Sequence, residues 1–230
     1  TKDELSQLPS NKNSEVFIAD LSSLNDVRKV AEEIKFKHEK IDILINNAGL
    51  IEDKKRKESI DGNELTLATN HLGPFLLTAL LFDLVKKSED GRIINLSSEA
   101  HAIAKADFEN IQLKRGYSAI KAYANSKLYN ILFTKELDRR IKENGFNISV
   151  NAVHPGVVNS GFGKNANGFA GFIFKALQVF FTSPEKGAET SIYLAHSMAG
   201  TQVSCEYSKD KKIKMPNDKI VNEENEKKRR

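Results

Sequence analysis

The chain has 230 residues, of which 40% are hydrophobic, and this is enough for one domain with a large core. Its net charge of +4 comes from 35 basic residues scattered among 31 acidic ones, which fits a solvated surface and a phosphate-bearing cofactor better than nucleic acid. The single cysteine, Cys205, excludes an intrachain disulfide framework and a multi-cysteine zinc site.

The sequence shows no signal peptide and no apolar run near the roughly 20 residues that a membrane-spanning helix needs. With one cysteine, a reducing compartment fits best. We therefore expect a cytoplasmic location, either free or peripheral to the endoplasmic reticulum membrane. The chain begins at Thr1 instead of Met, so the question of a preceding targeting or anchoring segment stays open.

Four short apolar runs alternate with helical patterns. The runs are residues 15–21 (EVFIADL), 41–45 (IDILI), 92–96 (RIINL) and 147–153 (NISVNAV). Helical patterns cover residues 23–38, with Ser22 or Ser23 as N-cap, then 63–87, 117–132 and 184–197, where Pro184 suits a first helical position. β-branched runs without strict alternation, separated by helices, indicate a parallel sheet covered on both faces. The predicted fold class is therefore a doubly wound α/β fold.

Tyr123 and Lys127 stand four residues apart on the third predicted helix, so they share one of its faces. A phenol has a pKa of about 10, and a cation held beside it favours the phenolate, which brings the phenol into range for proton transfer. Alone, such a pair is more often a surface lysine beside a half-buried tyrosine. The rest of the sequence has to decide between these interpretations.

Small polar or glycine-bearing clusters follow all four apolar runs. They are Asp20, the segment NNAG from Asn46 to Gly49, Ser97 with Ser98, and His154 with Pro155 and Gly156. In doubly wound sheets, ligands bind outside the carboxyl ends of the strands. Each cluster alone also fits a helix cap or a turn. Their occurrence at four strand ends indicates a ligand site.

The segments NNAG (46–49), NHLGPF (70–75), RIINLSS (92–98), YANSK (123–127) and HPGVV (154–158) resemble, in order and spacing, the short-chain dehydrogenase/reductase family. The resemblance covers about Val16 to Tyr207. The long connection after Ser98 and the stretches FLLTALL and LYNILFTKEL are most similar to its retinol dehydrogenase-like branch. The resemblance implies a Rossmann fold and an NAD(P)-dependent oxidoreductase that interconverts an alcohol and a carbonyl.

The resemblance also implies a catalytic set of Asn70, Ser98, Tyr123 and Lys127. Tyr123 matches the acid/base that exchanges a proton with the substrate oxygen, and Lys127 matches the residue that lowers its pKa and bonds the nicotinamide ribose. Ser98 matches the hydroxyl that orients the substrate oxygen. Asn70 matches the asparagine that holds a water for a proton relay through Lys127. Without the other members, a packed or helix-bending amide would be the simpler interpretation of Asn70.

The cofactor contacts implied by the resemblance are Asp20, Asn47, Ala48, Gly49, Tyr123, Lys127, Pro155, Gly156, Val158 and Ser160. Asp20 matches the acid that meets the adenine amino group, and Gly49 allows close backbone approach. Ser160 stands where the family usually has Thr. His71 and His154 are interpreted as packed residues. No cluster has metal-ligand spacing, so we predict no catalytic metal.

The chain departs from the family at its start, because it contains no glycine-rich TGxxxGxG turn to hold the pyrophosphate. We hypothesise a fragment that lacks roughly 40–60 N-terminal residues, on the basis of one βαβα unit. By family topology the first two strands would lie between residues 15–21 and 41–45. The residue that selects NAD or NADP is absent with them, and the branch resemblance alone favours NADP.

We expect residues 1–230 to form one N-terminally incomplete domain. Residues 161–183 match the family's substrate lid, and they carry five phenylalanines: Phe169, Phe172, Phe174, Phe180 and Phe181. Such a lid suits a small lipophilic substrate of retinoid, steroid or aldehyde type. The residues leave open a helix packed on the core or one lying on a membrane surface. Residues 208–230 are expected to be a charged tail of surface loop with the start of a helix.

Two other functions remain as alternatives. A catalytically silent regulator or scaffold of the same fold is favoured by the missing opening and opposed by the intact set of four. An isomerase or epimerase would share Tyr123 and Lys127 but would differ from NNAG and HPGVV. We expect no nucleic-acid partner, and the family habit of pairing through the helices at 63–87 and 117–143 suggests a homodimer.

Overall fold

The computed structural model describes residues 14–52, 55–156, 183–197, 200 and 203–214. Within these residues, five strands form one sheet in chain order: β1 (Ile43–Asn46), β2 (Gly91–Leu96), β3 (Ile148–His154), β4 (Tyr207–Lys209) and β5 (Lys212–Lys214). The first four are parallel, and β5 returns antiparallel to β4. The prediction of an α/β fold around a parallel sheet is confirmed.

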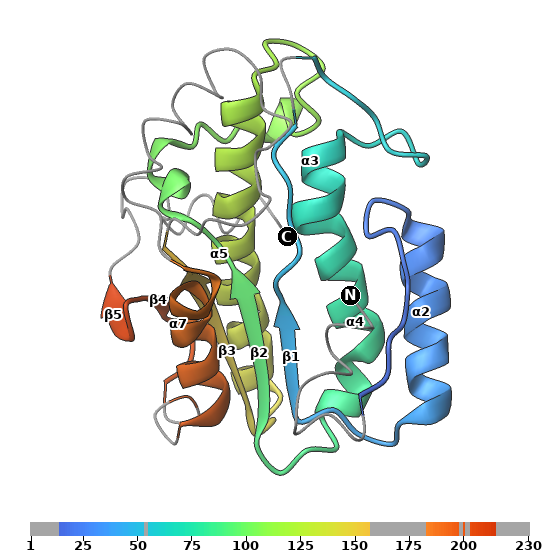
Figure 1. Cartoon of the computed structure of the whole chain (residues 1–230), viewed down its shortest axis with the longest axis vertical. Helices are drawn as coiled ribbons and strands as arrows, with labels where there is room; N and C mark the ends of the chain where they lie inside the picture. The colour runs from blue at the N-terminus through green and yellow to red at the C-terminus, as the bar shows by residue number, and fades with distance from the viewer. Residues whose placement is uncertain (1–13, 53–54, 157–182, 198–199, 201–202, 215–230) are drawn as a thin grey trace.

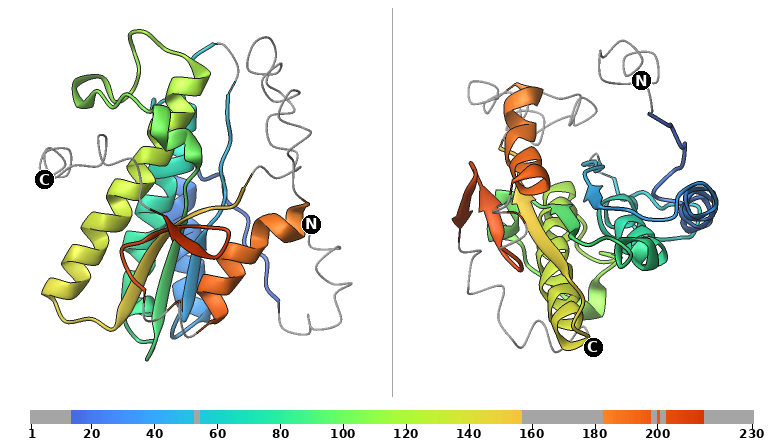
Figure 2. Two further views of the ribbon diagram at one scale, coloured as in Figure 1. Left: turned by 90° about the vertical axis from the view of Figure 1, so that its left-hand side faces the viewer. Right: turned by 90° about the horizontal axis from the view of Figure 1, so that it is seen from below.

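Helices cover both faces of this sheet (Figure 2). One face carries α4 (Gly73–Val85) and α5 (Ala119–Glu143), the other carries α7 (Pro184–His196), and α2 (Leu24–Lys37) packs outside α4 (Figure 1). Neighbouring residues of β2 point to opposite faces, so Ile93 packs with Val150 under α5, whereas Ile94 packs with Leu194 of α7. Because both faces of β2 are buried, apolar residues follow one another along its sequence instead of alternating with polar ones.

The helix starts follow from local capping. Of the two candidate caps, Ser23 is the N-cap of α2, because its side chain accepts a hydrogen bond from the N–H of Asp26 at 3.2 Å. Ser118 caps α5 in the same way through the N–H of Lys121, also at 3.2 Å. This cap makes α5 begin two residues after its predicted start.

The strand predicted at residues 15–21 is wrong. Residues 14–20 form no strand, and instead pack on the end of α2, where Glu15 pairs with Lys37 and the Phe17 ring lies edge-on to His38. A strand forms only through a ladder partner, and β1 is the edge strand of the described sheet. Because this segment has no such partner among the described residues, it stays at the surface and Ile18 is 92% exposed.

The long helix predicted at residues 63–87 is interrupted. A turn of α-helix, α3 (Leu65–Leu67), is followed by a π-helical turn (Ala68–Leu72) before α4 begins. The cause is Pro74, which has no N–H to continue the ladder, so Gly73 donates to the backbone oxygen of Ala68, five residues earlier. Gly73 is needed there, because a Cβ would lie 2.2 Å from the oxygen of Leu21.

One helical stretch among the described residues, Leu65–Val85, is long and apolar enough to cross a membrane. The sequence analysis expected no such stretch. Half of its most apolar window is buried inside the fold, where Leu81 and Leu84 pack with α2. The core helix of a soluble protein meets the same length and composition criteria, so this stretch is weak evidence for a membrane span.

The tail predicted from residue 208 is wrong in its first part. Residues 207–214 form the β4–β5 hairpin, and Tyr207 is buried in the core at 4% exposure. The turn residues Asp210 and Lys211 have φ of 51° and 58°, the left-handed pair that a tight hairpin turn requires. Charged strands of three residues carry too little pattern to be recognised from sequence.

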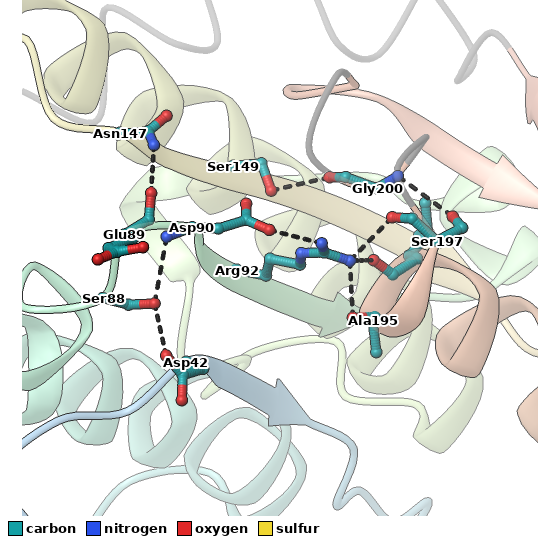
Figure 3. A network of polar contacts seen from close by, with 11 residues as sticks. Asp42, Ser88, Glu89, Asp90, Arg92, Asn147, Ser149, Ala195, Ser197 and Gly200 are labelled. Atoms are coloured by element: carbon teal, nitrogen blue, oxygen red, sulfur yellow. Dashed lines mark hydrogen bonds and ion pairs between the residues drawn. The ribbon is translucent and has the colours of Figure 1, made fainter.

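Arg92 anchors α7 to the sheet at the end opposite the strand-end clusters (Figure 3). Its Nη1 donates to three backbone oxygens at the end of α7, those of Leu194, Ala195 and Ser197, at 3.1, 2.7 and 2.9 Å. Its Nη2 pairs with Asp90 at 2.6 Å. Helix carbonyls without intrahelical partners are thereby satisfied by a buried cation.

We predict that Arg92→Met destabilises the protein by about 2–4 kcal/mol, because one buried and two partly buried carbonyls lose their donor. Urea unfolding followed by circular dichroism measures the change. Arg139→Met is the matched control, since it removes exposed ion pairs to Glu136 and Glu143, with an expected loss under about 1 kcal/mol. Equal losses in the two variants would contradict the anchoring role.

Candidate active site

Three of the predicted clusters meet at one edge of the parallel sheet. Asn46 and Asn95 are register partners in β1 and β2, and Leu96 is the partner of Val153 in β3. The segments that follow these strands, 47–49, 97–98 and 155–156, therefore leave the sheet side by side. The ligand site expected from the strand ends has a common location in the fold.

Tyr123, Ser98 and Lys127 converge at this edge. A hydrogen bond joins the Ser98 hydroxyl to the phenol of Tyr123. Nζ of Lys127 lies 5.6 Å from the centre of the Tyr123 ring and donates to the backbone oxygen of Leu96 at 3.1 Å. Below them, the hydroxyl of Ser97 donates to the backbone oxygen of Lys127 at 2.8 Å, which ties α5 to the end of β2.

The two titratable side chains of this group have shifted pKa values. Burial raises the pKa of Tyr123 to about 12, and the hydrogen bond with Ser98 opposes this shift to a smaller extent. Burial also lowers the pKa of Lys127 to about 8. The lowered pKa that the sequence predicted for Tyr123 is wrong for the structure described. The ammonium group is directed at Leu96, so desolvation of the phenolate is the larger effect.

Asn70 joins the segment after β1 to α5. Its Oδ1 accepts from the N–H of Leu50 at 2.7 Å, and its Nδ2 donates to the oxygen of Leu50 at 2.8 Å and to Ser126 at 3.1 Å. The hydroxyl of Ser126 in turn donates to the backbone oxygen of Tyr123 at 2.7 Å. Both Nδ2 protons are therefore used, and the side chain links the segment at Gly49 with the helix that carries Tyr123.

Gly49 lies against this group so closely that a side chain would not fit freely. A Cβ at this position would be 3.2 Å from Oδ1 of Asn70 and 3.4 Å from Nζ of Lys127. Asn47 and Ala48 are exposed at the same edge, and Pro155 and Gly156 are half-buried beyond β3. The remaining predicted contacts, Val158 and Ser160, lie outside the described residues.

Asp20 is exposed, and its carboxylate accepts from the N–H of Ser22 at 2.8 Å, so the contact shown is a local turn before α2. His71 and His154 are buried, as the packed interpretation required. His154 is the last residue of β3 instead of a loop residue, and burial lowers its pKa to about 4.

A cleft of about 560 Å³ begins next to Ser98, at the neighbouring residue Glu99. It begins at the 3₁₀ turn Glu99–Ile103, which Ser98 caps, and extends to the β4–β5 hairpin. The described lining residues are mainly polar or charged: Glu99, His101, Ala102, Tyr207, Lys209, Asp210 and Lys214. The size suits a small organic molecule.

Two residues of this network, Ser126 and Asn130, were not predicted from the sequence. Ser126 lies inside the quoted motif YANSK, between the two residues that drew attention. Asn130 lies one turn after Lys127, and its side chain bonds the backbone oxygens of Asn70 and Leu96, both at 3.0 Å. The signal in the sequence was an amide three residues after Lys127, on the same face of the helix.

The fold and this strand-end site define a doubly wound α/β protein with a Tyr and Lys pair at the carboxyl edge of its sheet. The chain belongs to the short chain dehydrogenase family, whose family model matches residues 1–169. The resemblance noted from the sequence motifs is thereby confirmed.

Relatives of known name agree with the branch suggested by the sequence. The retinol dehydrogenase 11 of Mus musculus is 39% identical over 199 residues, which cover 84% of this chain and 62% of that protein. The retinol dehydrogenase 13 of Homo sapiens is 41% identical over 212 residues, covering 89% and 63%. The chain spans about three fifths of the length of these two relatives.

Solved structures share the fold. The Pseudomonas aeruginosa RhlG/NADP active-site complex superposes with a TM-score of 0.66 at 24% sequence identity, over 89% of this chain and 78% of that chain. At this identity the likeness bears on the fold, and it agrees with the Rossmann-like arrangement of strands and helices described above.

Proposed function

We propose that the protein is an NAD(P)-dependent oxidoreductase that interconverts an alcohol and a carbonyl. The observation that carries this proposal is the meeting of the Ser98 hydroxyl and the Tyr123 phenol, with Lys127 beneath the ring. A neutral phenol and a hydroxyl can both donate hydrogen bonds to one substrate oxygen, as proton transfer to a carbonyl requires. The nicotinamide cofactor supplies the hydride when bound.

Each member of the set has a role in the proposed reaction. Tyr123 gives a proton to the carbonyl oxygen in reduction and removes one from the alcohol in oxidation. Ser98 orients that oxygen, and the ammonium group of Lys127 bonds the ribose of the cofactor. Asn70 holds the segment at Gly49 against α5 through Leu50 and Ser126. Its part in a water relay stays a prediction.

The residues of the strand-end edge fit a dinucleotide. Gly49 leaves the space that a Cβ would fill beside Asn70 and Lys127, and Asn47 and Ala48 are exposed next to it. We propose NADP, with NAD as the alternative, because the related structure above was solved with NADP. Asp20, Pro155, Gly156, Val158 and Ser160 remain proposed contacts on the strength of the family motif.

The proposed substrate is a small lipophilic alcohol or aldehyde, because two relatives at 39% and 41% identity are retinol dehydrogenases. The described lining of the cleft beside Ser98 is more polar than such a substrate needs. The phenylalanine-rich segment 161–183, which would supply apolar lining, is described only at Ser183.

A homodimer through α4 and α5 stays a prediction, as does contact with a membrane surface. These helices present Phe75, which is 43% exposed, beside the Phe133 ring at 5.0 Å between centres. Phe133 is buried at 7% exposure, so Phe75 is the apolar ring of this pair that a partner could cover.

Fluorescence titration with NADPH and NADH tests the cofactor part of the proposal. We expect the parent protein to enhance and shift the nicotinamide emission, and Gly49→Val to weaken binding at least about tenfold, because the added side chain meets Asn70 and Lys127. Gly62→Val, outside the site at a φ of 75°, controls for the backbone strain of a glycine substitution, and we expect it to leave the affinity of the folded protein within about threefold. The same titration on a chain extended upstream to its native start separates a missing pyrophosphate turn from a missing function. If the extended protein also binds neither dinucleotide, the oxidoreductase is refuted and the scaffold remains.

Turnover then tests the chemistry. We expect reduction of a long-chain aldehyde or of retinal with NADPH, followed by loss of its absorbance, to be faster than reduction of a small charged aldehyde such as glyoxylate. Preference for the charged aldehyde would contradict the lipophilic substrate while leaving the oxidoreductase in place.

A further inference from the structure

Asn130 lies on α5 one turn after Lys127, and its side chain is only 5% exposed. All its hydrogen-bonding groups are used. Nδ2 donates to the backbone oxygens of Asn70 and Leu96, both at 3.0 Å, and Oδ1 lies 3.0 Å from Nδ1 of His71. Because an amide oxygen only accepts, Nδ1 of His71 carries the proton in this pair.

The first of these backbone oxygens is left free by the local sequence. In a continuous α-helix, the N–H of residue 74 would donate to the oxygen of Asn70, but Pro74 has no N–H. The chain forms the π-helical turn instead, with Gly73 bonded to Ala68. The oxygen of Asn70 therefore needs a donor from another element, and Asn130 supplies it.

The second oxygen belongs to Leu96, the last residue of β2, which directly precedes Ser97 and Ser98. This oxygen also accepts from Nζ of Lys127 at 3.1 Å. A carbonyl oxygen has two lone pairs and can hold both donors. One amide thus connects the carbonyl that holds Lys127 with the turn that carries Asn70.

We propose that Asn130 is a positioning residue that fixes Asn70 and Lys127 relative to Ser98. Its effect on rate rests on the proposed function, whereas its effect on geometry does not. Asn130 acts through the backbone of Asn70 and Leu96, so its removal should displace the groups that meet the substrate and cofactor. A displacement of this kind slows the chemical step more than it weakens substrate binding.

The geometric part is tested by hydrogen exchange at one amide. The N–H of Leu50 donates to Oδ1 of Asn70, so its exchange with deuterium reports whether that side chain keeps its place. In Asn130→Leu we expect the Leu50 amide to exchange at least about tenfold faster, while the amide of Val150 in the buried strand β3 changes less than about threefold. Equal acceleration of both amides, or an unchanged Leu50 amide, overturns the proposal.

A control variant separates positioning from lost stability. Thr134 is equally buried one turn further along α5. It accepts from Nδ2 of Asn95 at 3.0 Å and donates to the backbone oxygen of Asn130 at 2.9 Å, so it touches the backbone but not the side chain of Asn130. Thr134→Val therefore removes a comparable buried bond away from Asn70, and we expect its Leu50 amide to exchange as in the parent. Should Asn130→Leu fail to fold, Asn130→Ala leaves room for water and serves for the same comparison.

The rate is the second readout. In steady-state reduction with NADPH, Asn130→Leu is expected to lower kcat about tenfold or more and to change KM less than about threefold. An unchanged kcat overturns the positioning role. If neither this chain nor one extended upstream to its native start reduces an aldehyde, the proposed function is refuted, and the Leu50 amide still decides whether Asn130 holds Asn70 in place.

Discussion

Replacing Tyr123 by Phe is expected to lower the rate of carbonyl reduction by about 10²–10⁴-fold, which is the usual contribution of a positioned general acid. The phenol is the group hydrogen-bonded to Ser98, and Phe keeps the ring that packs above Lys127. Binding of NADPH should therefore be unchanged within about threefold. Steady-state kinetics and fluorescence titration on the same preparation measure the two quantities.

Tyr129→Phe is the matched control for this substitution. It removes a buried phenol from the same helix, in a side chain that is 2% exposed and whose ring packs near His71 and Phe108. We expect its kcat to stay within about threefold of the parent. Equal losses in the two variants would assign the effect to packing of α5 and would remove Tyr123 from the proposed chemistry.

The pKa of Tyr123 determines how the contribution of this phenol to the rates of reduction and oxidation depends on pH. Because burial raises this pKa to about 12, the phenol stays protonated through neutral and mildly alkaline pH and can act as an acid. We therefore expect the rate of reduction to stay flat up to about pH 7 and to fall as Lys127, whose pKa is about 8, loses its proton, whereas Tyr123 itself causes no loss up to about pH 9.

The sequence predicted the apolar runs that pair within the sheet and failed for the run that has no ladder partner among the described residues. The segments at 41–45, 92–96 and 147–153 became strands within two residues of their predicted ends, because an apolar β-branched run in a parallel sheet needs no further signal. Residues 15–21 have the same composition, but they pack on α2 and pair with no strand. The residues of a segment do not show which other strand it will pair with.

The site was predictable to the level of its residue types. Motifs with fixed spacing located Ser98, Tyr123 and Lys127, which the fold brings together. The bonding between them was not predictable, because the direction of the Lys127 ammonium group depends on the free carbonyl of Leu96. Pro74 leaves the backbone oxygen of Asn70 without a helical donor. This role could likewise be recognised only from the path of the helix.

Lys127→Met is expected to stabilise the cofactor-free protein at pH 7 by on the order of 1–3 kcal/mol while abolishing turnover. Burial lowers the pKa of Lys127 to about 8, so the folded protein holds a charge that the unfolded chain solvates better. A shift of one pKa unit corresponds to about 1.4 kcal/mol, and the lost bond to Leu96 offsets part of the gain. Met retains the length and the apolar stem.

The pH dependence of this stabilisation identifies its cause. Between about pH 8 and the ordinary lysine pKa of 10.5, the unfolded chain binds a proton that the folded chain has lost, so the parent gains stability as pH rises. The difference between Lys127→Met and the parent should therefore be largest below pH 8 and shrink toward pH 10. Urea unfolding at both pH values measures it, with Lys121→Met near the start of α5 as control. A difference that stays constant would mean that packing, and not the buried charge, separates the variant from the parent.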